Sequence, residues 1–100
     1  MSRNRALTPI LKGRSIAQIG WDKATAILHF DNGSVMRIHT PAAPPANAPP
    51  VTLGKVRAVR QSSEAIILDL EDGSSVQLPL EEATSSVILR DAKGALEYAD

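Results

Sequence analysis

Residues 27–34 read Ile-Leu-His-Phe-Asp-Asn-Gly-Ser, and residues 67–74 read Ile-Leu-Asp-Leu-Glu-Asp-Gly-Ser. The similarity extends without a gap on both sides of these stretches, through the apolar pairs Ile16/Val56, Ile19/Val59, Met36/Val76 and Ile38/Leu78. A repeat period near forty residues is typical of a duplicated supersecondary unit. The sequence therefore predicts two copies of one small unit within this chain of 100 residues. This prediction concerns the fold, and it leaves the function open.

The Asp-Asn-Gly turn of the first copy decides which side chains share a face of the predicted hairpin. A two-residue loop at Asn-Gly would pair Leu28 with Arg37, and it would place apolar and charged side chains on one face. A three-residue loop, with Gly33 in the left-handed region, pairs Leu28 with Met36 instead. The same register also gives a clean apolar face in the second copy. We therefore expect a three-residue loop in both copies.

Each hairpin is preceded by a shorter predicted strand, at residues 16–21 and 56–61. Its apolar residues are spaced by three, as in Ile16 and Ile19, which does not fit a straight strand and indicates a bulge or bend. Each copy is therefore expected to be a three-stranded meander. A unit of fewer than about 40 residues seldom buries enough surface to be stable alone. The two meanders should pack against each other or against a second subunit.

The whole chain is expected to be a single all-β domain, a small barrel or sandwich made from two three-stranded meanders and a C-terminal hairpin. It divides into a basic arm (1–14), repeat one (15–40), a Pro/Ala linker (41–50), repeat two (51–80) and a C-terminal hairpin (81–100). One turn of helix is expected at residues 9–12. The linker holds five prolines and is expected to be a stiff connector, the alternative being a ligand for a proline-binding domain. A four-residue loop in the C-terminal hairpin would pair Leu89 with Leu96.

The net charge of zero conceals an asymmetry between the two copies. Residues 1–60 contain nine Lys/Arg against two acidic residues, a balance of +7, and residues 61–100 contain the reverse, a balance of −7. One interpretation is attraction between the halves, within one fold or between subunits. The other is a basic surface for nucleic acid or another anion. The candidate anion or nucleic-acid contacts are Arg3, Arg5, Lys12, Arg14, Arg37, Lys55, Arg57, Arg60 and Arg90.

The sequence offers little chemistry. It contains no cysteine, which excludes disulfides and thiolate metal sites and fits a cytoplasmic location. No apolar run is long enough for a membrane span, and the charged N-terminus is not expected to be a signal peptide. His29 and His39 are expected several residues apart on the face away from the core, so they should not share a metal ion. Since no catalytic or cofactor motif is found, we expect no enzyme activity, cofactor or metal site.

The segment Val87-Ile-Leu-Arg-Asp-Ala-Lys-Gly-Ala-Leu-Glu-Tyr98 resembles the second Sm motif, a hydrophobic residue, an arginine and a glycine before a last strand. Asp91 stands in place of that glycine, and the first Sm motif, with its uridine-binding Asp and Asn, is not visible. Residues 55–100 are similar to the small barrels of the Sm-like and SH3-like classes, and to small bacterial proteins of unknown function with an Asp-Gly hairpin. The resemblance implies a five-stranded meander in which Arg90 contacts RNA.

Two functions remain open after these observations. The first is a non-catalytic assembly or binding module that acts as a homo-oligomer, through strand edges or through its basic and acidic halves. Partial apolarity of the outer face, at Ile27, Val35 and Ile67, favours this function. The alternative is an Sm-like RNA-binding ring protein that uses the basic N-terminal half, and its RNA binding would weaken steeply with salt.

Overall fold

The computed structural model describes residues 2–41, 54–82 and 86–100, and within these ranges the chain is an antiparallel β structure with one short helix. Its elements are β1 (Ser2–Arg3), α1 (Leu7–Leu11), β2 (Ser15–Asp22), β3 (Thr25–Phe30), β4 (Val35–His39), β5 (Gly54–Gln61), β6 (Ala65–Leu70), β7 (Ser75–Pro79), β8 (Val87–Arg90) and β9 (Leu96–Ala99). The strand order is β7-β6-β5-β2-β3-β4-β8-β9, with β1 beside β5. The predicted all-β class is confirmed, and most of the proline-rich linker lies outside the described residues.

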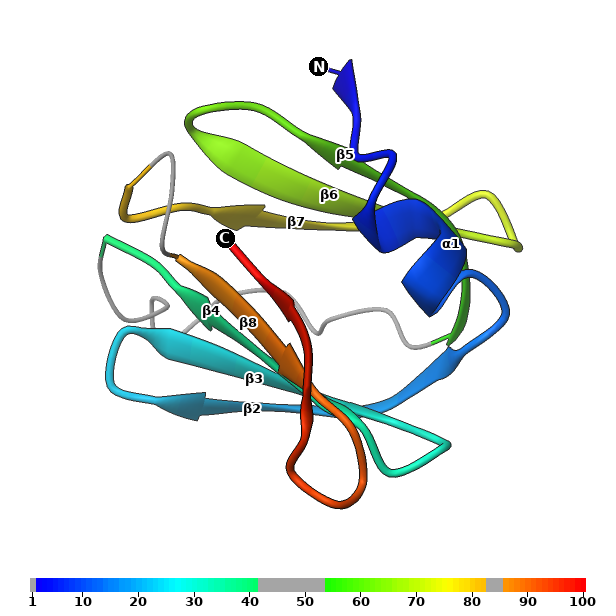
Figure 1. Ribbon diagram of the computed structural model, residues 1–100. Helices are drawn as coiled ribbons and strands as arrows, with labels where there is room; N and C mark the ends of the chain where they lie inside the picture. Colours follow the sequence, from blue (N-terminus) through cyan, green and yellow to red (C-terminus); the bar gives the residue numbers. More distant parts are fainter. Residues whose placement is uncertain (1, 42–53, 83–85) are drawn as a thin grey trace.

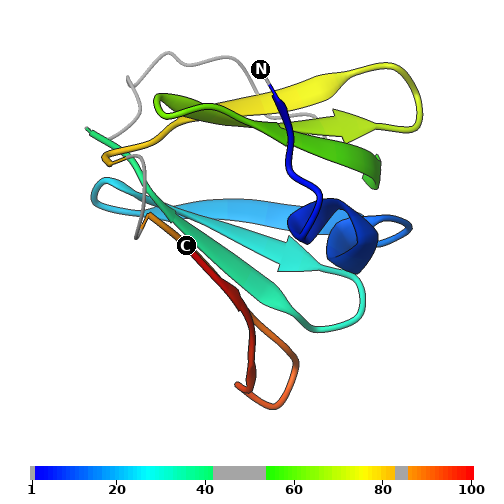
Figure 2. The same ribbon diagram turned by 45° about the horizontal axis from the view of Figure 1, so that its top comes forward.

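The two meanders form two facing layers (Figure 1). β5, β6 and β7 lie in one layer and β2, β3 and β4 lie in the other, and Figure 2 shows the same separation from a second direction. One core lies between the layers, and its buried side chains come from both meanders, from α1 and from β8. The meanders therefore bury their apolar faces against each other within a single chain.

β2 and β5 meet at a local two-fold axis. Ser15 pairs with Lys55, which is the residue at the equivalent position forty residues later. The surroundings of these two residues match as well, since the Asp31 N–H donates to the Ser15 carbonyl and the Glu71 N–H donates to the Lys55 carbonyl, both at 2.9 Å. The strand pairings of the two meanders agree at this offset, except that the pair Asp22 and Thr25 has no counterpart between β5 and β6.

Both meanders turn through the three-residue loop that the register argument predicts. The Phe30 N–H donates to the Ser34 carbonyl at 2.9 Å, and the Leu70 N–H donates to the Ser74 carbonyl at the same distance. The turn glycine has a φ of +88° in the first meander and +92° in the second. Glycine adopts this left-handed conformation without the steric cost of a side chain. The predicted loops are therefore confirmed in both meanders.

β2 and β5 each carry the bulge that the spacing of their apolar residues predicts. The pairing register shifts between Ile16 and Gln18 in β2, and between Val56 and Ala58 in β5. A bulge places two residues opposite one. Apolar residues three positions apart, such as Val56 and Val59, can therefore both point into the core, where both are fully buried.

The first 14 residues differ from the basic arm that the sequence predicts. α1 begins at Leu7, two residues before the expected turn of helix, and the side chains of Leu7 and Leu11 are fully buried in the core. The Thr8 hydroxyl donates to the Val59 carbonyl at 3.1 Å and accepts from the Val59 N–H at 3.0 Å. α1 thereby provides a hydrogen-bond partner for both backbone groups of Val59 at the outer edge of β5. The arm prediction was wrong because it rested on the basic residues, whereas the docking depends on two leucines four positions apart on one helix face.

Asn4 connects the N-terminal segment to the end of β5 and to β9. Its side-chain oxygen accepts from the Leu7 N–H at 2.8 Å, which caps the start of α1. Its amide nitrogen donates to Gln61 at 2.8 Å and to the Tyr98 hydroxyl at 3.1 Å. Gln61 in turn donates to Asp100 at 3.0 Å. Where the end of β5 lies near β9, side-chain hydrogen bonds therefore join the two layers, and no backbone pairing between the described strands does so.

β8 pairs with β4 and not with β7, so the C-terminal half does not form one continuous meander. The predicted register of the last hairpin is wrong, since Leu89 faces Tyr98 and not Leu96. The Asp91 N–H donates to the Ala95 carbonyl at 2.8 Å, and the Asp91 carboxylate accepts from the Ala95 N–H at 2.9 Å. These bonds favour another three-residue loop, followed by a bulge. Leu96 is consequently 56% exposed.

Candidate functional site

Two of the nine candidate cations are ion-paired to carboxylates of the acidic half. Arg60 on β5 donates twice to Asp69 on the neighbouring strand β6, at 2.8 and 2.9 Å. Arg14 donates twice to Glu97 on β9, also at 2.8 and 2.9 Å. At these positions the attraction between the halves is satisfied within one chain.

Arg14 connects β9 to the turn between β3 and β4. Besides its bonds to Glu97, the guanidinium donates to the Ser34 hydroxyl at 3.2 Å. Ser34 is fully buried, and its N–H donates to the Asn32 side chain at 3.0 Å. The hydrogen bond from Arg14 lowers the pKa of Glu97, and the same bond raises the pKa of Arg14. This cluster holds the C-terminal hairpin against the first meander.

Replacing Glu97 with glutamine is expected to make the fold less sensitive to acid. Because Arg14 lowers the pKa of Glu97 in the folded chain, this carboxylate contributes stability at pH values above the ordinary pKa that it has in the unfolded chain. The contribution is lost as the pH falls through the lower folded pKa. Glu97→Gln should therefore cost about 1 kcal/mol at neutral pH and almost nothing in strong acid. Urea unfolding at both pH values measures this.

Glu82→Gln is the matched control for this prediction. The Glu82 carboxylate is exposed and belongs to no ion pair within the described residues, so its replacement should leave stability unchanged at both pH values. If Glu97→Gln destabilises the protein equally at neutral and at acidic pH, the ion pair with Arg14 does not operate in solution.

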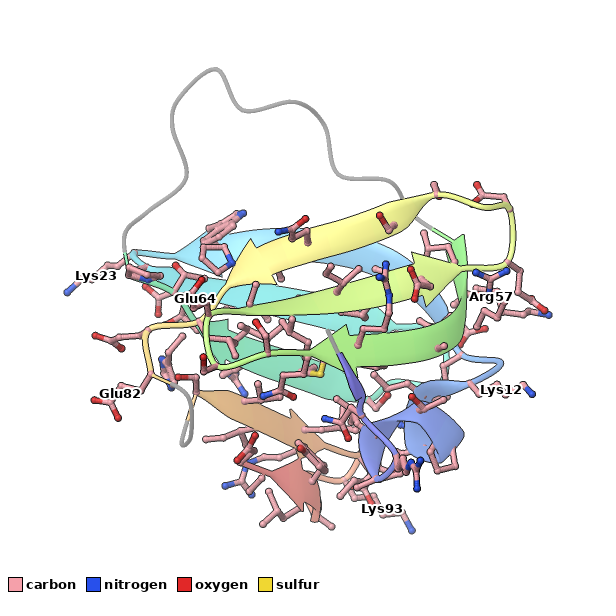
Figure 3. All side chains as sticks on the ribbon, turned by 90° about the horizontal axis from the view of Figure 1, so that it is seen from above. Lys12, Lys23, Arg57, Glu64, Glu82 and Lys93 are labelled. Carbon is pink, nitrogen blue, oxygen red and sulfur yellow. The ribbon has the colours of Figure 1, made fainter. Side chains whose placement is uncertain are left out.

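A second group of cations lies exposed on β5 and in the segments just before and just after α1. Arg5 and Lys12, together with Thr8 and Pro9, line a shallow depression on the surface of α1. Arg57 is exposed on β5, and Figure 3 shows Lys12 and Arg57 toward the same end of the molecule.

The remaining candidates are dispersed. Lys55 is exposed on β5, and Arg37 is exposed on β4. Arg90 donates to the Gly94 carbonyl of its own hairpin at 3.0 Å. Of Arg3 only the backbone is described, and it pairs with β5. The structure therefore does not bring the nine predicted contacts together into one site.

The described residues contain no cluster of three or more His, Asp or Glu side chains that could hold a metal ion. His29 is exposed, and the His39 ring lies 3.2 Å from the Thr25 hydroxyl at the other end of β3. Every buried side-chain nitrogen or oxygen in this part of the chain has a partner. In the same ranges, the structure has no helix with the length and apolarity needed to cross a membrane.

The outer edge of β7 presents backbone groups that no described residue binds. The Ser74 carbonyl accepts from β6, and the Leu80 N–H donates to the loop before β6. Since these groups alternate along an antiparallel strand, the N–H and carbonyl groups of Ser75 and Gln77 point away from β6. The Pro79 carbonyl points the same way, and Pro79 has no N–H.

β4 holds the equivalent place in the first meander, and its outer edge is covered. Arg37 pairs with Ile88 of β8, and the His39 N–H donates to the Ser86 carbonyl at 2.8 Å. On β7, by contrast, the described residues provide a neighbour on one side only, which is β6. The sequence predicted open strand edges without saying which strand would stay open. Pro79, which stands where His39 does in β4, was the available signal, since proline in a sheet is confined to edges and strand ends.

Comparison with known proteins gives no match, whether to a protein-family model, to a curated protein or to a solved structure. The resemblance of the segment 87–98 to the second Sm motif therefore stays a prediction.

Proposed function

We propose that this protein is a non-catalytic binding and assembly module that adds a strand to the open edge of β7. The observation that carries the proposal is the difference between two equivalent strands: β4 is covered by β8, whereas no described residue covers β7. An open edge offers unpaired N–H and carbonyl groups to an extended segment, and strand addition is a common mode of peptide recognition. The internal repeat predicted from the sequence supports the proposal. Because β4 and β7 are equivalent strands of the two copies, the pairing of β8 with β4 shows how an added strand could pair with β7.

Hydrogen exchange at single amides tests whether this edge is open. The amides of Ser75 and Gln77 should exchange at least about tenfold faster than those of Val35 and Arg37, which are covered by β8. Protection of Ser75 and Gln77 that persists on dilution would mean that the chain covers its own edge, and the proposal would fail. Protection that disappears on dilution would mean that a second copy occupies the edge, which supports assembly through β7.

The homo-oligomer expected from the sequence stays a prediction, and the dilution series bears on it directly. One part of that expectation is no longer needed. Since both meanders contribute to one core within the chain, an oligomer does not require repeats exchanged between subunits. Association would involve surfaces that are already complete in the monomer.

RNA binding through the basic half draws less support from the geometry. Arg14 and Arg60 are paired with carboxylates, and Arg90 is bonded to its own turn. Arg5 and Lys12 offer a basic depression, but the chain supplies few aromatic side chains for stacking bases. RNA binding stays a prediction. If it occurs through phosphate contacts, the measured affinity for RNA should fall steeply as the salt concentration rises.

A further inference from the structure

We infer that the strand accepted by β7 is an antiparallel peptide segment with apolar residues at alternate positions and basic residues at its ends. This inference rests on the proposed function and names the chemistry of the partner.

The covered edge of the first meander supplies the geometry of the partner. β8 runs antiparallel to β4, and its side chains Val87 and Leu89 lie opposite the core-facing residues of β4, where both are fully buried. On β7 the core-facing residues are Val76 and Leu78, which are also buried. A strand added to β7 in the same register would place two apolar side chains, two positions apart, beside them.

Acidic residues flank β7 at both ends. Glu71 and Asp72 precede the strand, Glu81 and Glu82 follow it, and all four side chains are exposed. None of the four carboxylates forms an ion pair within the described ranges. The strand between them, Ser75–Pro79, carries no charge. Lysine or arginine at both ends of a partner strand would therefore meet an opposite charge on each side.

The same charges disfavour pairing of β7 with the β7 of a second copy. Two identical strands that pair about a two-fold axis run antiparallel, so the Glu71–Asp72 end of one lies beside the Glu81–Glu82 end of the other. In the register centred on Gln77, Asp72 stands opposite the second copy's Glu82. Like charges directly opposite each other destabilise a strand pair. The flanking acidic residues therefore disfavour pairing between the β7 strands of two copies, and they attract a basic partner strand.

Fluorescence polarisation with two labelled peptides tests this inference. The first probe is Lys-Lys-Ser-Val-Ile-Leu-Arg-Lys, whose centre is the sequence of residues 86–90 that covers β4. The second has glutamate in place of each lysine and arginine. At low salt the basic peptide should bind at least about tenfold more tightly, and the preference should shrink as salt is added.

Variants of β7 locate the binding and test the role of charge. Gln77→Pro should abolish binding, because it removes an outward-pointing N–H that the added strand would need. No described residue accepts a hydrogen bond from this N–H, so the substitution removes no described hydrogen bond of the fold. Gln77→Thr keeps the N–H and should bind as the wild type does. The double variant Glu71→Lys with Glu82→Lys should reverse the preference and favour the acidic peptide, while Glu71→Gln with Glu82→Gln should reduce it.

The outcomes separate this inference from the proposed function. Equal binding of both peptides, lost in Gln77→Pro, would overturn the charge rule and leave strand addition intact. Basic-peptide binding that survives Gln77→Pro would overturn the β7 location. Failure of both peptides to bind, while the Ser75 and Gln77 amides exchange rapidly, would refute this partner and leave the edge open. Protection of those amides in the absence of peptide, whether it persists on dilution or disappears, would overturn the inference.

Discussion

Replacing Leu11 with alanine is expected to lower the free energy of unfolding by about 2 to 5 kcal/mol. The Leu11 side chain is fully buried in the core, to which it is delivered by α1. Alanine would leave a cavity there. The helix cannot easily move to fill it, because both Thr8 hydrogen bonds hold α1 to Val59 on β5. Urea unfolding followed by circular dichroism measures the loss.

Leu96→Ala is the matched control, since it removes the same atoms from a side chain that is 56% exposed. Its effect should stay within about 0.5 kcal/mol. A solvated basic arm at the N-terminus would make the two substitutions equivalent. Equal stabilities of Leu11→Ala and Leu96→Ala would therefore show that α1 is not docked in solution.

Alanine at Gly33 is expected to cost more than alanine at Gly73, although the two glycines occupy equivalent turns. Each has a left-handed backbone, with φ of +88° and +92°, so alanine costs about 1 to 2 kcal/mol at either position. At Gly33 the new Cβ would also lie 2.8 Å from the Ala92 Cβ, whereas nothing lies within 4 Å at Gly73. Overpacking of this kind adds roughly 1 to 3 kcal/mol. Thermal or urea unfolding of both variants gives the difference.

Ala92→Gly in the Gly33→Ala background tests the cause of the difference. Removing the Ala92 methyl group removes the overlapping atom, so the double variant should recover most of the excess cost while the left-handed cost remains. Because Gly73→Ala shares the backbone conformation but not the contact, it isolates the close approach of the two turns. Equal losses of stability in Gly33→Ala and Gly73→Ala would mean that the turn containing Gly33 and the turn containing Ala92 can move apart without cost.

The pairing within each meander could be predicted because local pattern decides it. Leu28 lies opposite Met36, as the apolar alternation requires, and the same rule gave the register of the second copy. The rule failed in the last hairpin, where Leu89 faces Tyr98. There the Asp91 carboxylate binds the backbone of its own loop, and a pattern of apolar residues contains no information about that bond.

Contacts between distant segments could not be predicted from local patterns. β8 had two equivalent strands to join, and the sequence alone did not indicate that β4 would receive it and β7 would stay open. The charge count indicated attraction between the halves, but it did not identify Arg14 and Glu97 as partners 83 positions apart. The existence of an open strand edge could therefore be predicted from the sequence. Its location on β7 could not, because it depends on how the two layers fold over each other.

The axis at which Ser15 meets Lys55 has the symmetry of a pair of identical chains. Here both partners are parts of one molecule, so their association is unimolecular and independent of protein concentration. In a pair of identical chains every substitution appears twice, on both sides of the axis. Joined halves are released from that constraint, and Asn32 and Asp72 differ accordingly. The two halves can therefore diverge in sequence and in surroundings: β8 covers the outer edge of β4, whereas no described residue covers the outer edge of β7.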